Sequence, residues 1–249
     1  MGIGRSTLDF MLLEHAARPF RGNALTLGRQ DIHFNMASLA QCARNAGVQL
    51  LEVPPEPSAK PELAARGNIS DQSFFKALGF ASLRALDISG YEGASVIWDL
   101  NRSGVPEAYR GAFDFILDGG TFEHVFHIPN ALANLHDLVA VGGRIMHALP
   151  VSNYVDHGFY MFSPTLFCDY YLYNGYQLNG VLLHRIDRWG PNNSPGQFIE
   201  YIPAYFRNHQ PGGIDGAVWN LFVTVTRTAQ ATSGKIPPQG YFYQVLTRS

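Results

Sequence analysis

Two short apolar segments lie on either side of a helical pattern in the middle of the chain. The first runs from Phe113 to Leu117 and the second from Arg144 to Leu149, and about twenty-five residues of helical pattern separate them. This spacing predicts a right-handed parallel strand-helix-strand unit. Ligands of such units bind outside the carboxyl ends of the strands. We therefore expect a binding site near residues 118–124 and 150–157.

Further strand and helix patterns flank this unit. Apolar runs bounded by turn residues predict strands over residues 24–28, 82–88, 94–98, 181–186 and 221–226. Helical spacing and capping residues predict helices over residues 5–18, 34–46, 72–78 and 164–174. The alternation predicts an α/β fold with a doubly wound, mostly parallel sheet, and the last two strands predict an antiparallel edge hairpin.

Composition limits the class of protein and its partners. With 249 residues and 46% apolar content, residues 1–249 can form one domain with a sizeable core. A formal charge of -2 and the absence of long basic runs disfavour nucleic acid and anionic membranes as partners. The two cysteines, Cys42 and Cys168, are too few for a disulfide framework, and no apolar run has the length of a membrane span or signal peptide. We expect a cytoplasmic protein, and its oligomeric state cannot be read from the sequence.

Two segments rich in proline or glycine are predicted to be irregular. Residues 48–70 contain four prolines and predict an exposed inserted loop. Residues 189–215 contain several glycines and prolines and predict a substrate lid. The tail from Thr232 is expected to be loosely ordered, except that Tyr241-Phe242-Tyr243 can dock.

An ordered set of short motifs runs through the central unit. Phe122-Glu123-His124-Val125 is followed by Gly142-Gly143, Pro150, His157 and then Phe162-Ser163-Pro164. This order resembles the class I S-adenosylmethionine-dependent methyltransferases over roughly residues 22–228, with Gly142-Gly143 as the turn between helix and strand. The resemblance implies a Rossmann-like methyltransferase fold, S-adenosylmethionine as cofactor, and methyl transfer to a small molecule or glycan. The alternative is a non-catalytic binding or scaffold protein that has lost the cofactor.

The resemblance also implies which residues hold the cofactor. Acidic residues that end the second and third strands contact its ribose and adenine, and residues at the ends of the first and fourth strands line the rest. The matching positions are Gly28, Gln30, Asp87, Asp99, Leu100, Asp118 and Gly119. Only about five residues, Ser89 to Gly93, connect the strands that end at Asp87 and Asp99, whereas a parallel crossover normally needs a dozen or more. Both aspartates could instead simply terminate strands and start turns.

The loop after the first strand departs from the glycine-rich pattern of the family. Only Gly28 matches, because Arg29 to His33 stands where further glycines are usual. In the functional interpretation, Gln30 or Asp31 hydrogen-bonds the amino or carboxylate group of the cofactor. In the other interpretation, the loop is degenerate and no longer binds it.

Histidines surround the predicted mouth of the site. His157, which follows the second central strand, is the preferred general base because imidazole titrates near neutral pH, with Glu123 and His124 as further catalytic candidates. Each histidine could equally be a structural hydrogen-bonding group. His124 and His127 could share one helix face beside Glu123, but no recognised metal-binding motif is present and we expect no metal. The tyrosines of residues 170–176 could line a substrate pocket or form core.

Overall fold

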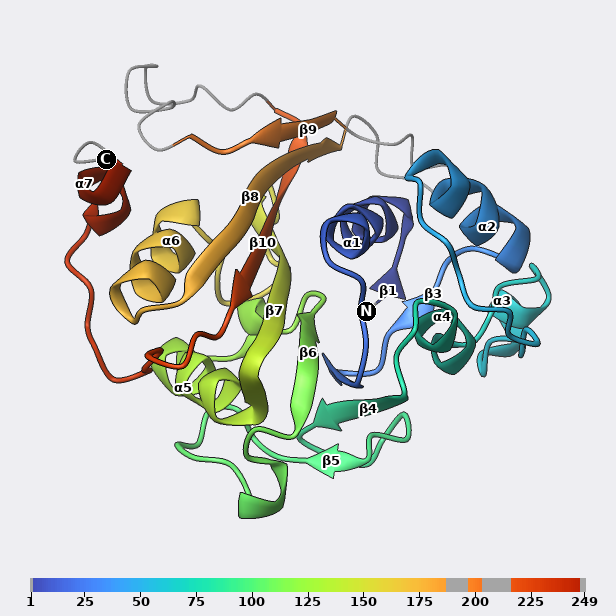
Figure 1. Ribbon diagram of the computed structural model, residues 1–249, viewed down its shortest axis with the longest axis horizontal. Helices are drawn as coiled ribbons and strands as arrows, with labels where there is room; N and C mark the ends of the chain where they lie inside the picture. Colours follow the sequence, from blue (N-terminus) through green and yellow to red (C-terminus); the bar gives the residue numbers. More distant parts are fainter. Residues whose placement is uncertain (1, 187–196, 203–215, 247–249) are drawn as a thin grey trace. The chain divides into compact units, whose positions relative to one another are not determined.

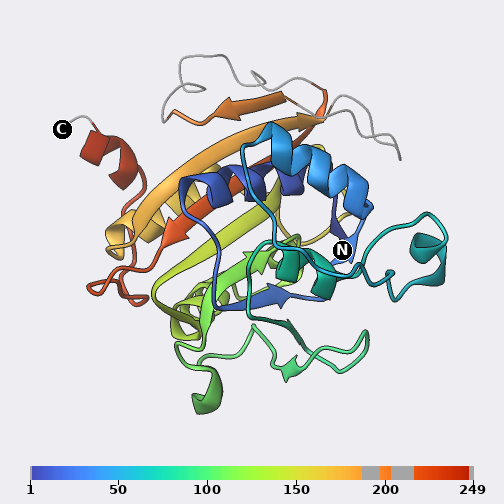
Figure 2. The same ribbon diagram turned by 45° about the vertical axis from the view of Figure 1, so that its right-hand side comes forward.

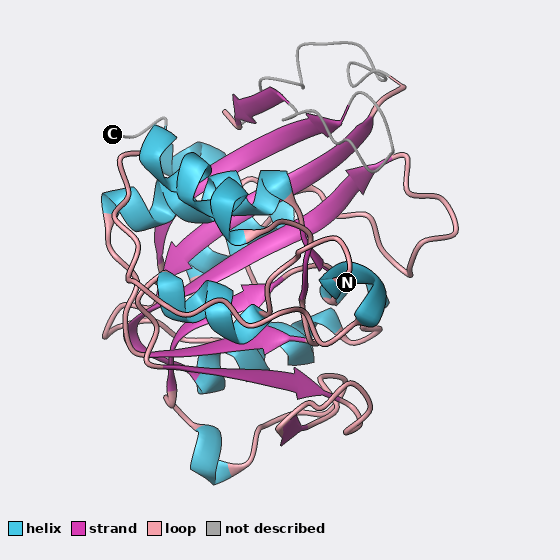
Figure 3. Ribbon diagram, turned by 90° about the vertical axis from the view of Figure 1, so that its right-hand side faces the viewer, coloured by secondary structure: helices cyan, strands magenta, loops and turns pink. Residues whose placement is uncertain are grey.

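The computed structural model describes residues 2–186, 197–202 and 216–246. Helices and strands occur along the whole of this described part, which confirms the α/β class (Figure 3). The chain forms two compact units: unit 1 comprises Met1–Asp99 and Phe113–Gly119, and unit 2 comprises Leu100–Ala112 and Gly120–Ser249. The expectation that the whole chain is one domain stays a prediction.

Unit 1 contains four parallel strands in the spatial order β5-β4-β2-β6 (Figure 1). Its elements are β1 (Gly2–Ile3), α1 (Arg5–Ala17), β2 (Asn23–Leu27), β3 (Asp31–Ile32), α2 (Met36–Asn45), α3 (Pro61–Ala64), α4 (Asp71–Ala77), β4 (Ser82–Asp87), β5 (Val96–Ile97) and β6 (Phe113–Asp118). Counted along the chain, these four strands have the order third, second, first, fourth. That order is one half of a doubly wound sheet, so the predicted parallel architecture is confirmed here.

The central strand of unit 1 is β2, which pairs with β4 on one side and β6 on the other. Leu27 lies beside Leu86 of β4 and beside Asp118 of β6. The carboxyl ends of the three strands are therefore level, and side chains that follow them gather at one edge of the sheet.

Phenylalanines fill much of the core of unit 1. The ring of Phe20 packs on Phe115 of β6 and on Phe80, with centroid distances of 4.8 and 5.0 Å. Phe74 and Phe75 of α4 are fully buried; the ring of Phe75 packs on Phe80, and that of Phe74 packs on Phe75. Helix α4 begins after Ser70, whose hydroxyl caps it, at the place where the sequence predicts a short helix. Its buried rings attach it to the core of unit 1.

The connection between β4 and β5 is as short as the sequence suggests. Residues 88–95 join two parallel strands without a helix, and β5 itself has only two residues. Pairing begins at Leu86 and Val96, near the carboxyl end of β4. The chain therefore turns back beside β4 instead of crossing its whole length, which removes the need for a long crossover.

The short elements β1, β3 and α3 were not predicted. β3 pairs in parallel with β1 in a separate two-stranded sheet, so a strand stands between the end of β2 and helix α2. The proline-rich segment 48–70 is irregular as predicted, but it contains the one-turn helix α3 and closes on itself through a bridge between Pro57 and Ile69.

Unit 2 contains four antiparallel strands in the order β7-β10-β8-β9. Figure 2 shows the long strands β7, β10 and β8 side by side. The elements are the 3-10 turns η1 (Glu107–Tyr109) and η2 (Phe122–His124), followed by α5 (Ile128–Leu138), β7 (Val139–Ser152), α6 (Pro164–Tyr173), β8 (Gln177–Ile186), β9 (Gln197–Glu200), β10 (Val218–Thr226) and α7 (Tyr241–Leu246). The predicted antiparallel pairing of the last strands is confirmed, and it extends to four strands.

The position of Gly142-Gly143 in unit 2 corrects the sequence prediction. Helix α5 ends at Leu138 and passes directly into β7, so the two glycines lie inside a strand. Gly142 has a φ of 81° and donates its N–H to Arg227. Extended pairing continues past the glycines because Arg227 also donates its N–H to the Gly143 carbonyl. Most of the predicted lid, 189–215, lies outside the described residues, although its part 197–200 is β9.

The tail after β10 is held in place, in contrast to the loosely ordered tail that we expected. The buried amide of Asn174 donates to Tyr170 and Lys235 and accepts from Lys235 and Thr232. The carboxylate of Asp169 accepts the backbone N–H groups of Gly240 and Phe242 at 2.6 and 2.7 Å. Asp169 in α6 and Asn174 at the end of α6 thus hold the segment that leads into α7. This agrees with the suggested docking of residues 241–243.

Three of the four tyrosines in residues 170–176 belong to the core, and Tyr173 is half-buried. Tyr170, Tyr171 and Tyr176 are buried, and the hydroxyl of Tyr171 lies 2.7 Å from Nε2 of the fully buried His147. These rings therefore do not line an open pocket. Within the described residues, no helix is both long enough and apolar enough to cross a lipid bilayer.

Candidate functional site

The carboxyl ends of the parallel strands in unit 1 bring the predicted cofactor residues to one edge. Gly28 follows β2, Asp87 ends β4, and Asp118 with Gly119 ends β6. Asp99 follows β5 by two residues. The chain runs outward from β2 to β4 and β5 and then returns to β6 on the other side of β2, so the strand order reverses beside β2. In doubly wound sheets, ligands bind at the carboxyl ends of the strands at such a reversal.

Gln30 occupies the space between the ends of β2 and β6. Its side chain is 2% exposed, and Nε2 donates to the carbonyls of Leu27 and Gly28 at 3.2 and 3.4 Å. Its Oε1 has no hydrogen-bond partner among the described residues. A Cβ on Gly119 would lie 2.8 Å from that oxygen, so a side chain at this position would collide with it. A buried acceptor therefore stands at the position where sheets of this kind bind ligands.

Ion pairs fix the loop that carries Gln30. Arg29 binds Asp71 of α4 at 3.1 Å, and its guanidinium also donates to the Glu92 carbonyl at 3.2 Å. Lys60 lies 2.6 Å from Asp31. Gly28 has a φ of 66° and donates its N–H to the Leu86 carbonyl at 2.7 Å. Side-chain contacts thus hold a loop that lacks the further glycines of the family pattern. The carboxylate of Asp31 forms an ion pair with Lys60.

The acidic residues at the strand ends differ in their surroundings. Asp118 is fully buried, while Asp87 and Asp99 are half-buried. Oδ1 of Asp87 accepts the N–H of Ser89 at 3.2 Å, as in a turn. Asp87 can therefore serve the turn and still offer an acceptor. Leu100 is a buried residue of unit 2, where its carbonyl accepts from Asn134.

A second group of chemically active side chains lies in unit 2. Glu123 and His124 belong to η2, and His157 lies in the loop after β7. Nε2 of His157 is 3.4 Å from Oε1 of Glu123, and the ring centroids of His124 and His157 are 5.2 Å apart. The Glu123 side chain is 3% exposed and that of His157 is 45% exposed. The three side chains that we predicted as catalytic candidates therefore lie together, and we call them the Glu-His-His cluster.

The backbone locks the two halves of this cluster together. The Glu123 carbonyl accepts the N–H groups of Phe159 and Tyr160 at 2.7 and 3.3 Å. A Cβ on Gly158 would lie 2.7 Å from the same carbonyl oxygen, so this close approach requires glycine. Next to it, Phe122 is fully buried and packs on His147 of β7 at 5.1 Å, which anchors η2 to the core.

The loop before His157 carries backbone strain and one further polar group. Asn153 and Asp156 both have a φ of 65°, a backbone conformation that residues other than glycine rarely adopt. Such conformations are common at functional sites. The Tyr154 hydroxyl donates to Asn220 at 2.5 Å. Burial raises the pKa of Tyr154 to about 12, and the charge of Glu123 adds to the rise. Tyr154 is therefore a hydrogen-bond donor and not a base, a role that its position in the sequence alone did not reveal.

His127 does not join the cluster. His124 lies in η2, whereas His127 precedes α5 and its N–H is bound by Asn101 at 3.0 Å. The predicted shared helix face of His124 and His127 is therefore wrong, because a break in the helix separates them. Contact with His157 across the fold replaces the contact that the spacing suggested.

Comparisons with known proteins were made by sequence and by structure. No protein-family model matches the sequence, and no curated protein matches it. The chain is similar to S-adenosylmethionine-dependent methyltransferases of known structure. A TehB-like one from Corynebacterium glutamicum is 13% identical, with a TM-score of 0.43, 89% of this chain and 88% of that chain being covered. One from Mesorhizobium loti is 11% identical, with a TM-score of 0.36 and coverages of 88% and 98%.

TehB from Haemophilus influenzae is 10% identical with a TM-score of 0.40, and 88% of this chain covers 62% of TehB. The chain thus spans less than two thirds of the length of TehB. Because these identities and TM-scores are low, the similarities assign neither a residue role nor a substrate to this chain.

The strand ends of unit 1 fit S-adenosylmethionine chemically. The cofactor carries donors, namely an ammonium group, ribose hydroxyls and an adenine amino group. Unit 1 offers acceptors at the same edge of the sheet, namely the Oε1 of Gln30, the carboxylate of Asp87 at the end of β4 and that of Asp99 after β5. The absence of a side chain on Gly119 leaves room beside Gln30.

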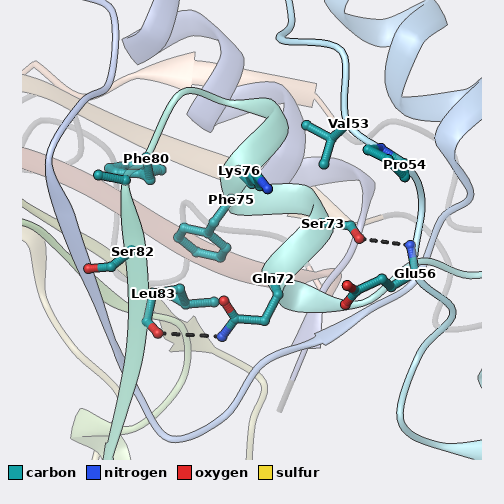
Figure 4. A pocket seen from close by; sticks show the side chains of 11 residues that line it. Val53, Pro54, Glu56, Gln72, Ser73, Phe75, Lys76, Phe80, Ser82 and Leu83 are labelled. Atoms are coloured by element: carbon teal, nitrogen blue, oxygen red, sulfur yellow. Dashed lines mark hydrogen bonds between the residues drawn. The ribbon is translucent and has the colours of Figure 1, made fainter.

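A surface pocket in unit 1 lies at the opposite end of β4 (Figure 4). It is lined by Gln72, Phe75 and Lys76 of α4, by Ser82 and Leu83 at the start of β4, and by the segment 53–56. Gln72 donates to the Leu83 carbonyl and Ser73 Oγ accepts the N–H of Glu56 across it. These bonds join α4 to its neighbours, so we assign no ligand to this pocket.

Proposed function

We propose that the protein transfers a methyl group from S-adenosylmethionine to a small molecule. The observation that carries this proposal is the buried Oε1 of Gln30 beside Gly119, at the carboxyl ends of the parallel strands, where ligands generally bind in doubly wound sheets. In this proposal Asp87 accepts hydrogen bonds from the ribose hydroxyls, and Asp99 accepts one from the adenine amino group. The Oε1 of Gln30 accepts a hydrogen bond from the ammonium group. When bound, S-adenosylmethionine supplies an electrophilic methyl group on a sulfonium.

The Glu-His-His cluster provides the groups that an acceptor needs. His157 is exposed enough to reach an acceptor hydroxyl and would take its proton, while the buried carboxylate of Glu123 lies 3.4 Å from the imidazole and positions it. Tyr154 donates to Asn220 and keeps the loop of His157 in place.

The surroundings of the cluster favour an acceptor with an apolar part. Phe126, Val155, Phe159 and Met161 are exposed by 61, 79, 64 and 48%, and the rings of Phe126 and Phe159 meet edge to face at 5.6 Å. Exposed apolar side chains that gather around polar groups are typical of binding surfaces. We therefore propose an apolar or aromatic small molecule as acceptor, with a glycan as the alternative, since aromatic rings also stack on sugars.

Titration with S-adenosylhomocysteine tests the cofactor assignment. We expect saturable heat in isothermal titration calorimetry, and Asp87→Ala should weaken binding by about 1 to 3 kcal/mol because the hydroxyls lose a charged acceptor. Asp114→Ala is the matched control: it removes a carboxylate from the amino end of β6, where Asp114 accepts the N–H of Asn23. Its affinity should equal that of the wild type.

Two results would contradict the assignment. Folded protein that gives no heat and no thermal shift at millimolar ligand would favour the non-catalytic scaffold. Equal affinities for Asp87→Ala and wild type, together with a lower melting temperature of the variant, would show that Asp87 serves only its turn with Ser89.

A further inference from the structure

The ligand atoms of the Glu-His-His cluster are close enough to share one ion. One carboxylate oxygen of Glu123 and one ring nitrogen each of His124 and His157 all lie within 4.8 Å of one another. Two imidazoles and one carboxylate are a ligand set that zinc and other divalent transition metals prefer, whereas Mg²⁺ and Ca²⁺ prefer oxygen ligands.

The cluster is built on fixed backbone. The N–H groups of Phe159 and Tyr160 donate to the Glu123 carbonyl and hold the loop there, and Gly158 permits the close approach. The buried ring of Phe122 packs on His147 and anchors the same turn. Because the ligand-bearing segments are already joined, an ion would have to order only side chains, which lowers the entropic cost of binding.

Exposure within the cluster leaves one side accessible. Glu123 is buried, while His124 and His157 are exposed, so the carboxylate forms the floor and the imidazoles form the rim. Three protein ligands with an open side are typical of catalytic metal sites, in which water or substrate completes the coordination.

We propose that Glu123, His124 and His157 bind one divalent transition-metal ion, for which Zn²⁺ is the reference. The open side of the ion would receive an acceptor oxygen and favour its deprotonation, with the proton passing to bulk water. His157 is the proposed base in the metal-free protein; with the ion bound it would act as a ligand, and the ion would take over the activation of the acceptor oxygen. Metal binding does not depend on the proposed methyl transfer, since it concerns residues of unit 2 alone.

Calorimetric titration with ZnCl₂ tests this site. After chelator treatment and dialysis, wild-type protein should bind one ion per chain, and His157→Gln should weaken binding by about tenfold or more. His127→Gln is the matched control, because this neighbouring histidine lies outside the cluster and should leave affinity unchanged. Visible absorption of the Co²⁺-loaded protein should show ligand-field bands that His124→Gln and His157→Gln alter and His127→Gln does not.

The test uses variants of the exposed His124 and His157, which should not disturb folding. It does not need Glu123→Gln, because Glu123 is buried and its substitution could destabilise the protein. A folded wild-type protein without a stoichiometric site, or a site that His157→Gln leaves intact, would overturn the proposal. Loss of affinity to the same degree in His127→Gln would also overturn it. Binding of S-adenosylhomocysteine is measured separately, so failure of one proposal is distinct from failure of the other.

Discussion

His184 is a buried imidazole on β8 whose titration should affect stability. Its side chain is 1% exposed and packs between the rings of Phe198 and Phe222, with centroid distances of 4.6 and 5.9 Å. Burial lowers the pKa of His184 to about 4. The unfolded chain takes up this proton near pH 6.5, so the free energy of unfolding should fall by roughly 1 to 3 kcal/mol as pH decreases from about 6.5 to about 4.

Chemical denaturation across this pH range measures the effect. His184→Gln removes the titrating ring and should show a smaller decrease, while carboxylates titrate equally in both proteins. Parallel profiles of wild type and variant would exclude His184 as the cause, whatever the variant costs in stability at neutral pH.

Single residues were predictable from the sequence where they end strands. Asp87, Asp118 and Gly119 stand at breaks in apolar runs, so their place at the sheet edge follows from local pattern. The position of the Gln30 side chain does not follow from local pattern, because it depends on the missing Cβ of Gly119, which follows a strand that is distant in sequence. For the same reason, spacing paired His124 with His127, whereas the fold pairs it with His157.

Helix α7 is a short element whose place depends on one carboxylate. Asp169 is 3% exposed and accepts two backbone N–H groups at residues 240 and 242. Asp169→Ala should leave both without their acceptor, lower the free energy of unfolding by about 1 to 3 kcal/mol, and increase amide exchange at residues 240–246. Hydrogen-exchange mass spectrometry together with thermal denaturation measures both.

Asp137→Ala is a suitable control for this element. Asp137 is also a carboxylate of unit 2, but it pairs with Arg110 near the surface at 2.9 Å, and such pairs contribute little. Unchanged exchange at residues 240–246 in Asp169→Ala would mean that packing, such as the contact of Tyr173 with Tyr241, holds α7 without the carboxylate.

Elements with a long apolar pattern and clear capping residues were predicted within a few residues of their ends. Helix α6 begins after the capping Ser163, and α1 buries its predicted apolar face. The two-residue strands β1 and β3 escaped prediction because two residues carry no periodicity. Gly142-Gly143 was predicted as a turn because glycine is common there, but pairing with Arg227 keeps the glycines in a strand.

At the scale of the whole molecule, the proposed cofactor-binding and catalytic residues belong to different units. Asp87 belongs to unit 1 and His157 to unit 2. His157→Ala should therefore retain wild-type affinity for S-adenosylhomocysteine and lower turnover by about 10² to 10⁴ with a hydroxyl acceptor. Asp87→Ala should weaken cofactor binding first. Steady-state kinetics at saturating cofactor, combined with calorimetry, separates the two effects.

A weakened affinity for S-adenosylhomocysteine in His157→Ala would contradict this division. A loss of acceptor affinity without loss of turnover would reduce His157 to a bracing residue of its loop. The overall class of the fold was predictable from alternating patterns, but the division into units was not, because it depends on contacts between segments that are far apart in the chain.

Unit 1 is discontinuous, and this affects how the protein emerges from the ribosome. Its central strand β2 pairs with β6, which is synthesised only after the segment Leu100–Ala112 of the other unit. Until then, one edge of β2 offers unpaired backbone groups between apolar side chains, and such an edge invites association with other chains. Nascent chains that end before Phe113 should accordingly need chaperone protection, and those that extend well past Gly119 should not.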